Sequence, residues 1–150
     1  MGIDGLSIRP AIPGDCPALE PLVAQLGYPV TVADLEDRLS EMRTAGLTVF
    51  VAELHGRIVG CLSTSMMQVL HRPQKVGRIS MMVVDETSRG SGIGRALVRH
   101  AEAHLVSRGC GLVEVTSNIR RADAHRFYER LGYQKTSVRL AHDCSTGGTP

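Results

Sequence analysis

The chain has 150 residues, of which 43% are hydrophobic and only 3% aromatic, so we expect one domain with an aliphatic core. The formal net charge is +2 and the basic residues are not interleaved with aromatic ones, which argues against nucleic-acid binding. The sequence shows no signal segment, no stretch of membrane-spanning length and no CxxC pair among its four cysteines, so we expect a cytoplasmic protein with reduced thiols, no membrane contact and no metal.

The charge is unevenly distributed along the chain. Residues 1–54 hold three Arg and eight Asp or Glu, a formal charge of −5, and the total of +2 therefore leaves +7 for the remainder. A basic second part suits a phosphate-rich cofactor and an acidic first part suits a cationic substrate. Ordinary surface charge explains the asymmetry equally well.

The first half of the chain predicts a strand, two helices and a hairpin. Apolar and polar residues alternate before a proline, apolar residues then recur at helical spacing between capping residues, and two apolar runs flank a tight turn. The predicted elements are a strand at 6–10, a helix opened by Gly14-Asp15 and ended by Gly27, a helix capped by Thr31 and ending near Gly46, and strands at 47–52 and 58–63 joined by His55-Gly56-Arg57.

The second half predicts strands and helices in alternation, followed by a tail. The predicted elements are a strand at 76–84, a helix at 93–107, a strand at 112–116, a helix that places Ala124, Phe127, Tyr128 and Leu131 on one face, a strand at 133–140 and a frayed tail at 145–150. The order β-α-α-β-β-β-α-β-α-β indicates an α/β (α+β) fold with a mixed central sheet flanked by helices. We expect a single domain over residues 1–144.

A glycine-rich turn after the strand at 76–84 is the most informative feature of the chain. Arg89-Gly90-Ser91-Gly92-Ile93-Gly94 leads directly into a helix that carries Arg95. Glycines allow backbone N–H groups to converge on one point, and a helix N-terminus adds partial positive charge. The turn therefore predicts a phosphate or pyrophosphate site.

Two common phosphate loops do not fit this turn. A Walker loop requires a Gly-Lys-Ser/Thr sequence, which the chain lacks. A dinucleotide fingerprint requires a small residue where Arg95 stands, or where Leu97 stands if the pattern starts at Gly92. The phosphate-bearing ligand must therefore be inferred from further segments of the chain.

Two segments together resemble the GNAT N-acetyltransferase superfamily. Arg89 to Gly94 fits its Q/R-x-x-G-x-G/A turn, the preceding Met82-Val83-Val84 resembles its apolar strand end, and 124–133 resembles its A-x-x-(F/L)-Y-x-x-x-G-(F/Y) segment. The element order also agrees, and the resemblance covers residues 6 to about 140. It implies that the strands ending at Val84 and Thr116 part to admit the pantetheine arm.

The resemblance also implies which residues hold acetyl-CoA. Main-chain groups of the strand end bind the pantetheine arm, and the turn with the helix start binds the pyrophosphate. The implied residues are Met82, Val83, Val84, Arg89, Gly90, Ser91, Gly92, Ile93, Gly94 and Arg95. The side chains of Arg89 and Arg95 either contact phosphate or remain solvated, because contacts in this family are largely made by the backbone.

Tyr128 and Glu114 are the candidate catalytic residues. Tyr128 matches the family tyrosine that protonates the coenzyme A sulfur, although a core tyrosine would also lie on the apolar helix face. The strand Arg78-Ile79-Ser80-Met81-Met82 lacks the glutamate that serves some relatives as general base. Glu114 on the following strand is the alternative base, and a solvent-facing Glu114 with a water chain as base stays open.

Four further positions carry candidate side chains. Relatives often carry a coenzyme-binding Asn where this chain has Arg121, so either Arg121 or the nearby Asn118 is expected to contact the coenzyme, and Arg121 can instead bind an acidic substrate. His100 and His104 have the i, i+4 spacing of metal ligands, but the sequence offers no third ligand and polar helix surface is the preferred interpretation.

The sequence therefore predicts an N-acetyltransferase that moves an acetyl group from acetyl-CoA to a primary amine by direct attack in a ternary complex. The alternative is a catalytically weak or inactive acyl-CoA-binding regulatory module. The acceptor is a small-molecule or protein amine, and the acids Asp34, Glu36 and Asp37 on the second helix could attract a cation. Because the chain ends one strand earlier than many relatives, we expect either that this edge strand is unnecessary or that a second subunit covers the sheet edge in a homodimer.

Overall fold

The computed structural model describes residues 2–117 and 120–145. Contacts divide the chain into a first unit that ends at Val115 and a second unit that begins at Thr116, and each is described by itself. The strands are β1 (Leu6–Pro10), β2 (Val49–Leu54), β3 (Arg57–Met67), β4 (Lys75–Val84) and β5 (Cys110–Val115). The helices are α1 (Cys16–Gln25), α2 (Val32–Thr44), α3 (Ile93–Ser107) and α4 (Ala122–Arg130).

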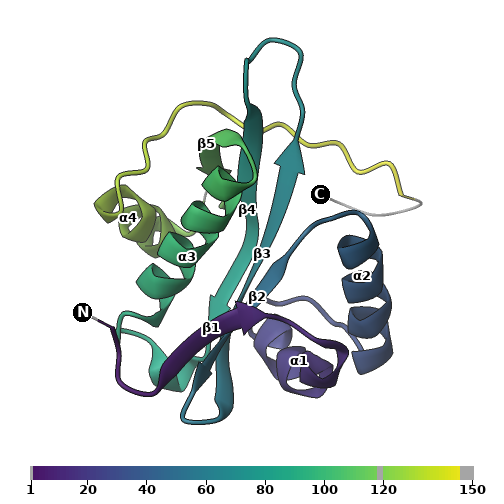
Figure 1. Ribbon diagram of the computed structural model, residues 1–150, viewed down its shortest axis with the longest axis vertical. Helices are drawn as coiled ribbons and strands as arrows, with labels where there is room; N and C mark the ends of the chain where they lie inside the picture. Colours follow the sequence, from purple (N-terminus) through teal and green to yellow (C-terminus); the bar gives the residue numbers. More distant parts are fainter. Residues whose placement is uncertain (1, 118–119, 146–150) are drawn as a thin grey trace. The chain divides into compact units, whose positions relative to one another are not determined.

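The first unit is a mixed five-stranded sheet in the order β1-β2-β3-β4-β5 (Figure 1). Neighbouring strands are antiparallel except for β4 and β5, which are parallel and joined through α3. This arrangement confirms the expected mixed sheet flanked by helices. Strand β3 is longer than predicted because Met66 and Met67 pair with Gly77 and Val76 on β4.

Helices α1 and α2 cover one face of the sheet, and α3 covers the other (Figure 1). The side chains of Cys16, Leu19 and Leu39 pack with Cys61 and Val83 in a buried aliphatic cluster on the α1–α2 face. Helix α2 begins as predicted, because Thr31 accepts a hydrogen bond from Asp34 N at 3.1 Å and Asp34 Oδ2 accepts one from Thr31 N at 3.0 Å.

Two glycines allow α3 to lie close to the sheet. A Cβ atom at Gly60 would lie 3.1 Å from Leu97 Cδ1, and one at Gly77 would lie 2.9 Å from Leu105 Cδ1. Leu97 and Leu105 are fully buried members of the predicted apolar stripe of α3. The packing of these leucines against bare backbone sets the distance between α3 and strand β4, which together carry the turn.

An ion-pair cluster fastens the start of the chain to the sheet. Arg9 on β1 donates two hydrogen bonds to Asp15, at 2.8 and 2.9 Å, and a third to Glu53 on β2 at 3.1 Å. Asp15 is buried, and the hydrogen bonds from Arg9 lower the pKa of its carboxyl group. The cluster links β1, β2 and the segment that leads into α1.

The second unit contains α4 and an extended segment, and the predicted strand at 133–140 is wrong. Residues 133–140 form no strand, and Val138 and Leu140 are 83% and 90% exposed. Four consecutive polar residues interrupt the alternation, and Tyr133 and Val138 are an odd number of residues apart, so a strand would place them on opposite faces. The segment therefore has no continuous apolar face to bury. The predicted tail lies outside the described residues from 146 on.

Among the described residues, no helix combines the length and apolar character needed to cross a bilayer. Strand β5 is an edge strand of the sheet, and no further strand follows it within the described ranges. The homodimer expected to cover this edge stays a prediction.

Replacement of Gly77 by Ala tests the close packing of α3. Gly77→Ala should lower the free energy of unfolding by about 1–3 kcal/mol, because the new methyl group meets the buried Leu105 side chain. Chemical denaturation measures the change. Gly14→Ala is the control, since its Cβ would meet nothing nearer than Ile12 Cδ1 at 4.0 Å. Equal unfolding midpoints for the two variants would contradict the packing described here.

Candidate functional site

Strand β5 ends opposite the middle of β4. Their ladder runs from the Lys75–Cys110 pair to the Ile79–Val115 pair, and β4 then continues alone on that side to Val84. Because β5 is paired up to its last residue, the parting that the resemblance implies at the ends of these strands stays a prediction. The end of β5 leaves residues 80–84 of β4 with a main-chain edge that no strand of this unit pairs.

The register of β3 and β4 determines which main-chain groups form this edge. Asp85 N donates to Val59 O at 2.8 Å, and hydrogen-bonded pairs alternate along an antiparallel ladder. Met81 and Val83 therefore direct their main-chain groups to β3, whereas Met82 and Val84 direct theirs away from it. The Val84 carbonyl confirms this direction, because it accepts a hydrogen bond from Arg89 Nε at 3.0 Å.

The glycine turn leads from this strand end into α3. Gly90 and Gly92 have φ values of 81° and 90°, a left-handed conformation that favours glycine. The first hydrogen bond of α3 runs from Ala96 N to Gly92 O at 3.0 Å. The N–H groups of Ile93, Gly94 and Arg95 consequently have no acceptor within the helix and point out of its N-terminus. Such a group of N–H donors suits a phosphate.

A polar network that the sequence did not reveal holds the turn in place. The buried Asp85 accepts hydrogen bonds from Gln25 Nε2 at 3.1 Å, Arg57 Nη2 at 3.0 Å and Thr87 Oγ1 at 2.9 Å. Gln25 Oε1 in turn accepts from Glu86 N at 3.2 Å. The network ties the end of α1 and the β2–β3 hairpin to the start of the turn. The hydrogen bond from Gln25 is the main cause of the lowered pKa of Asp85.

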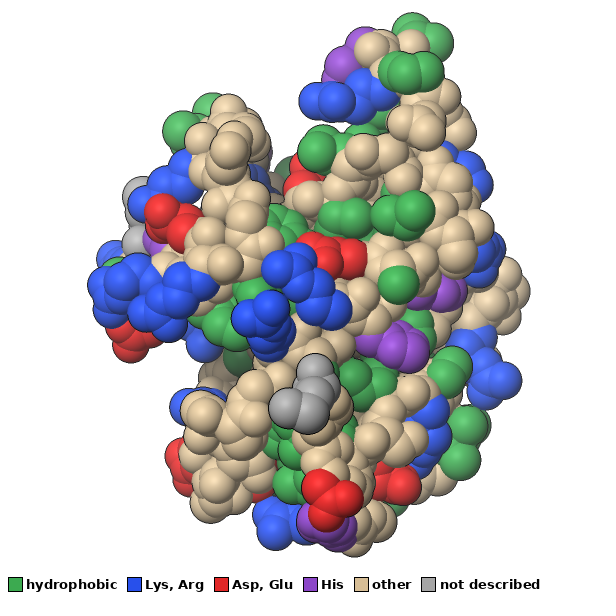
Figure 2. Space-filling view, turned by 60° about the vertical axis from the view of Figure 1, so that its left-hand side comes forward, with side chains coloured by type: hydrophobic (Ala, Val, Ile, Leu, Met, Phe, Trp, Pro, Cys, Tyr) green, Lys and Arg blue, Asp and Glu red, His purple; other side chains and the backbone are tan. Residues whose placement is uncertain are grey.

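Arg89 and Arg95, the two cations expected at the turn, are both exposed. Arg89 also contacts Gln25 Oε1 at 3.4 Å, so it joins the network as well as the Val84 carbonyl. Figure 2 shows Lys and Arg side chains gathered in clusters on one face of the molecule, with acidic groups between them.

Glu114, the candidate base, is paired with an arginine. Arg78 Nε and Nη2 both donate to Glu114 Oε1, at 2.8 and 2.6 Å, and the two residues are register partners on β4 and β5. Their side chains are 33% and 35% exposed. Because Arg78 engages one carboxylate oxygen of Glu114 with two hydrogen bonds, this pair favours a structural role for Glu114.

Tyr128, the candidate acid, lies in the second unit on α4. It is buried, and its ring contacts that of Tyr133 edge to face with centroids 5.7 Å apart. Burial raises the pKa of the phenol to about 12, and the nearby Arg121 opposes part of this rise. The hydroxyl group therefore carries its proton throughout the physiological range. Both the core and the acid interpretations from the sequence agree with this burial.

The remaining predicted residues are placed as follows. Asn118 lies outside the described residues, and Arg121 is exposed at the residue before α4. The rings of His100 and His104 both contact the ring of Phe50 edge to face, with ring centroids 4.8 and 5.1 Å apart. Helical spacing alone did not predict this packing role. In the part of the chain that the structure describes, no group of three His, Cys, Asp or Glu side chains could hold a metal.

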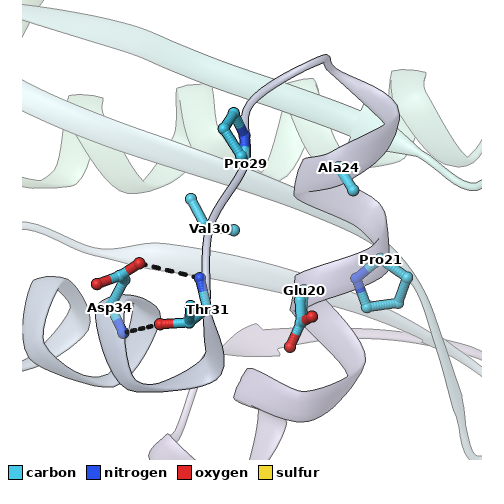
Figure 3. A pocket seen from close by; sticks show the side chains of 7 residues that line it. All are labelled: Glu20, Pro21, Ala24, Pro29, Val30, Thr31 and Asp34. Atoms are coloured by element: carbon cyan, nitrogen blue, oxygen red, sulfur yellow. Dashed lines mark hydrogen bonds between the residues drawn. The ribbon is translucent and has the colours of Figure 1, made fainter.

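A pocket of about 310 Å³ lies between α1 and the loop that leads into α2 (Figure 3). Glu20 and Asp34 are its acidic residues, and Pro21, Ala24 and Pro29 form its apolar side. Asp34 is engaged with Thr31 in the helix cap, and the cap lowers the pKa of its carboxyl group. Of the acids expected to attract a cation, Asp34 thus has a structural partner.

The chain belongs to the acetyltransferase (GNAT) family, whose sequence model matches residues 19–133. The match includes strands β4 and β5, the glycine turn and the Tyr128 segment. The resemblance inferred from the two motifs is confirmed.

Relatives within the family have several different names. Over 86 residues the chain is 40% identical to an aminoalkylphosphonate N-acetyltransferase from Salmonella typhimurium, a match that covers 57% of this chain and 56% of that protein. Matches to two mycothiol acetyltransferases span only 36% and 37% of their lengths. A glucosamine 6-phosphate N-acetyltransferase from Trypanosoma brucei brucei is 33% identical over 109 residues, 71% of this chain and 72% of that protein.

Solved structures share the fold. A transcriptional regulator from Bacillus halodurans has a TM-score of 0.84 and 27% identity, with 92% of this chain and 99% of that chain covered. The glucosamine-6-phosphate N-acetyltransferase from Arabidopsis thaliana has a TM-score of 0.81 and 26% identity, with 93% and 99% covered.

The Asp85 network should make stability depend on pH. The lowered pKa means that Asp85 contributes stability above the ordinary carboxyl pKa of 3.8 and loses it as the pH falls through the folded-state value. Between about pH 5 and pH 3, the unfolding free energy of the unaltered chain should therefore fall more steeply than that of Asp85→Asn. The exposed Asp37→Asn variant should follow the unaltered chain. Parallel curves for all three proteins would show that Asp85 carries no such linkage.

Proposed function

We propose that the chain is an acetyl-CoA-dependent N-acetyltransferase that acetylates a primary amine by direct attack in a ternary complex. The observation that carries the proposal is the main-chain edge of β4 beyond Ile79, where β5 has ended, beside a turn of outward N–H groups. A strand edge with free main-chain groups suits an extended chain with amide groups, and the turn suits a pyrophosphate. Acetyl-CoA has both parts, and when bound it supplies an activated acyl group.

Each part of the proposed site has its own residues. The main-chain groups of Met82 and Val84 bind the pantetheine arm, and the N–H groups at Gly92, Ile93, Gly94 and Arg95 bind the pyrophosphate. Arg89 moves from the Val84 carbonyl when the arm needs that acceptor, and its charge then stays next to the phosphates. Gly90 and Ser91 shape the turn, because Gly90 has a φ of 81° and Ser91 Oγ donates to Ser88 O at 2.6 Å. Either Asn118 or Arg121 adds a further contact.

The proton balance of the reaction defines the work of the side chains. The amine nitrogen forms a bond to the acyl carbon, the carbon–sulfur bond breaks, and the sulfur leaves with the electron pair. Tyr128 donates its proton to this sulfur and recovers one from solvent, while the amine loses one proton to a base. The raised pKa of Tyr128 keeps the phenol protonated at neutral pH, so a proton is available for the departing sulfur.

The base has two candidates. Arg78 engages Glu114 Oε1 and leaves Oε2 as the oxygen that could accept the amine proton, and water is the second candidate. A water chain suffices, because an amine that is neutral when it attacks loses its proton readily once the new bond forms.

The alternative is a binding module of the same fold that senses acyl-CoA. The structural likeness to a transcriptional regulator from Bacillus halodurans and the missing carboxylate on β4 favour it. The buried Tyr128 in its family motif favours catalysis.

The acceptor should be sought among amines of contrasting charge. The names of two relatives point to amines that also carry a phosphonate or phosphate group. The acidic first part of the chain points instead to cationic amines. A panel of amines separates the acceptors that carry a phosphonate or phosphate group from the cationic ones. The panel contains 2-aminoethylphosphonate, glucosamine 6-phosphate, spermidine, an aminoglycoside, glycine and a peptide with a free N-terminus.

We expect release of coenzyme A thiol when the chain is mixed with acetyl-CoA and at least one amine of this panel. The thiol is measured with a disulfide dye, and the acetylated product is identified by mass spectrometry. Tight binding of acetyl-CoA without turnover on any amine would instead support the sensing module. Absence of acetyl-CoA binding would rule out both functions.

Tyr128→Phe should lower kcat by about 10²-fold and change the dissociation constant of acetyl-CoA by less than about twofold, because only the proton donor is lost. Tyr133→Phe removes a hydroxyl from the neighbouring ring and should keep kcat within about threefold. An unchanged kcat in Tyr128→Phe would exclude the general-acid role.

Tyr128→Phe should also change how the free energy of unfolding depends on pH. Because the pKa of Tyr128 is raised to about 12 in the folded chain, the protonated phenol stabilises the fold below the ordinary pKa of 10. This stabilisation is lost as the pH rises through 12. From pH 10 upward, the unaltered chain should therefore lose more unfolding free energy than Tyr128→Phe.

A further inference from the structure

Strand β4 carries a bulge at the point where β5 ends. Ser63 pairs with Met81 and Thr64 pairs with Ile79, so Ser80 has no partner on β3. The β4–β5 ladder ends at the Ile79–Val115 pair. Ser80 is therefore both the bulged residue and the first residue of β4 beyond that ladder. Bulges of this kind redirect a side chain.

The bulge brings the hydroxyl groups of two serines together. Ser63 Oγ and Ser80 Oγ are 2.8 Å apart, and Ser80 Oγ also donates to the carbonyl oxygen of Ser63 at 3.2 Å. With the Ser80 proton on that carbonyl, the Ser63 proton lies between the two hydroxyl oxygens. Both protons are then used within the pair, and the pair offers lone pairs to a ligand. A group with N–H donors is the complementary partner.

The hydroxyl pair faces the side of the sheet that α1 and α2 cover. Cys61 and Val83 pack with residues of these helices, and Ser63 is two residues from Cys61 on the same strand, hence on the same face. Ser80 is exposed, so the pair remains accessible. Along β4, Ser80 and Met82 are two residues apart, which corresponds to a rise of about 7 Å. A ligand on the pair therefore lies beside the strand edge assigned to the pantetheine arm.

We propose that the Ser63–Ser80 hydroxyl pair accepts hydrogen bonds from the N–H groups of the acceptor's primary amine and thereby aims the amine at the acyl group. The proposal rests on the proposed acetyltransferase function and adds the residues that receive the acceptor. The amine approaches from the α1–α2 face while the cofactor lies along the strand edge, so the two reactants meet from different directions.

The neutral character of the pair has a chemical consequence. A carboxylate at this place would stabilise the ammonium form of the acceptor, which cannot attack. Hydroxyl oxygens orient the nitrogen without adding a negative charge, so they favour the protonated form less. This explains how the site can operate where the strand lacks a glutamate.

Alanine and threonine variants test the pair. Ser80→Ala should lower kcat/KM for the most active panel amine by about tenfold, the value of one hydrogen bond of about 1.4 kcal/mol, and leave the dissociation constant of coenzyme A within about twofold. Ser63→Ala should have a similar effect, and the double variant should be little worse than either single one, because the hydroxyls act as a unit. Ser80→Thr, which keeps the hydroxyl, should recover most of the loss. Ser7→Ala on the exposed face of β1 is the matched control.

Amine binding separates failure of this proposal from failure of the proposed function. If the unaltered chain acetylates no panel amine, the proposed function fails, and the pair is judged by calorimetric titration of 2-aminoethylphosphonate and spermidine with coenzyme A present. Weaker binding of either amine to Ser80→Ala supports the pair. Equal affinity, no binding to the unaltered chain, or an equal loss of coenzyme A affinity in Ser80→Ala overturns the proposal.

Discussion

The main-chain edge of β4 beyond the end of β5 is the constraint on which the rest of the structure depends. Beyond Ile79 and Val115, β4 loses its partner, and the main-chain groups of Met82 and Val84 face away from β3. Backbone N–H and C=O groups are costly to leave unpaired away from water, so this edge requires a partner. Arg89 partly meets the need at the Val84 carbonyl. An extended ligand with amide groups would meet it more fully.

The first unit places the glycine turn rigidly next to this edge. Gly60 and Gly77 allow Leu97 and Leu105 to press α3 onto the sheet, and α3 begins at the turn. Asp85 fixes the other end of the turn through hydrogen bonds from α1 and from the β2–β3 hairpin. The donors at the start of α3 are thereby preorganised, so little further ordering is needed when an anion binds.

Local patterns predicted much of the fold and part of the site. The bounds of α3 followed from its apolar stripe, and the start of α2 followed from the capping residue Thr31, because short-range hydrogen bonds and periodicity determine both. The strand predicted at 133–140 was wrong, since apolar residues alone do not make a strand when their alternation is broken. The partner of Glu114 could not be predicted, because Arg78 is distant in sequence and becomes a neighbour only in the sheet.

The features that the sequence could not reveal arise from pairing between distant segments. Gln25 and Asp85 meet through helix packing, and a bulge brings Ser63 to Ser80. Neither pair has a spacing signal, because the register of β3 and β4 and the docking of α1 create them. Contacts between polar residues at strand ends and bulges are therefore visible in the structure but not in the sequence motif of this family.

Amide NMR of the labelled full chain during titration with coenzyme A tests the central claim most directly. The account predicts saturable shifts that are largest at the N–H groups of Gly90 to Arg95 and of Met82 and Val84, with little change on β1. Large shifts confined to other parts of the chain, or no saturable change at the turn, would contradict the assignment of the β4 edge and the glycine turn as the coenzyme A site.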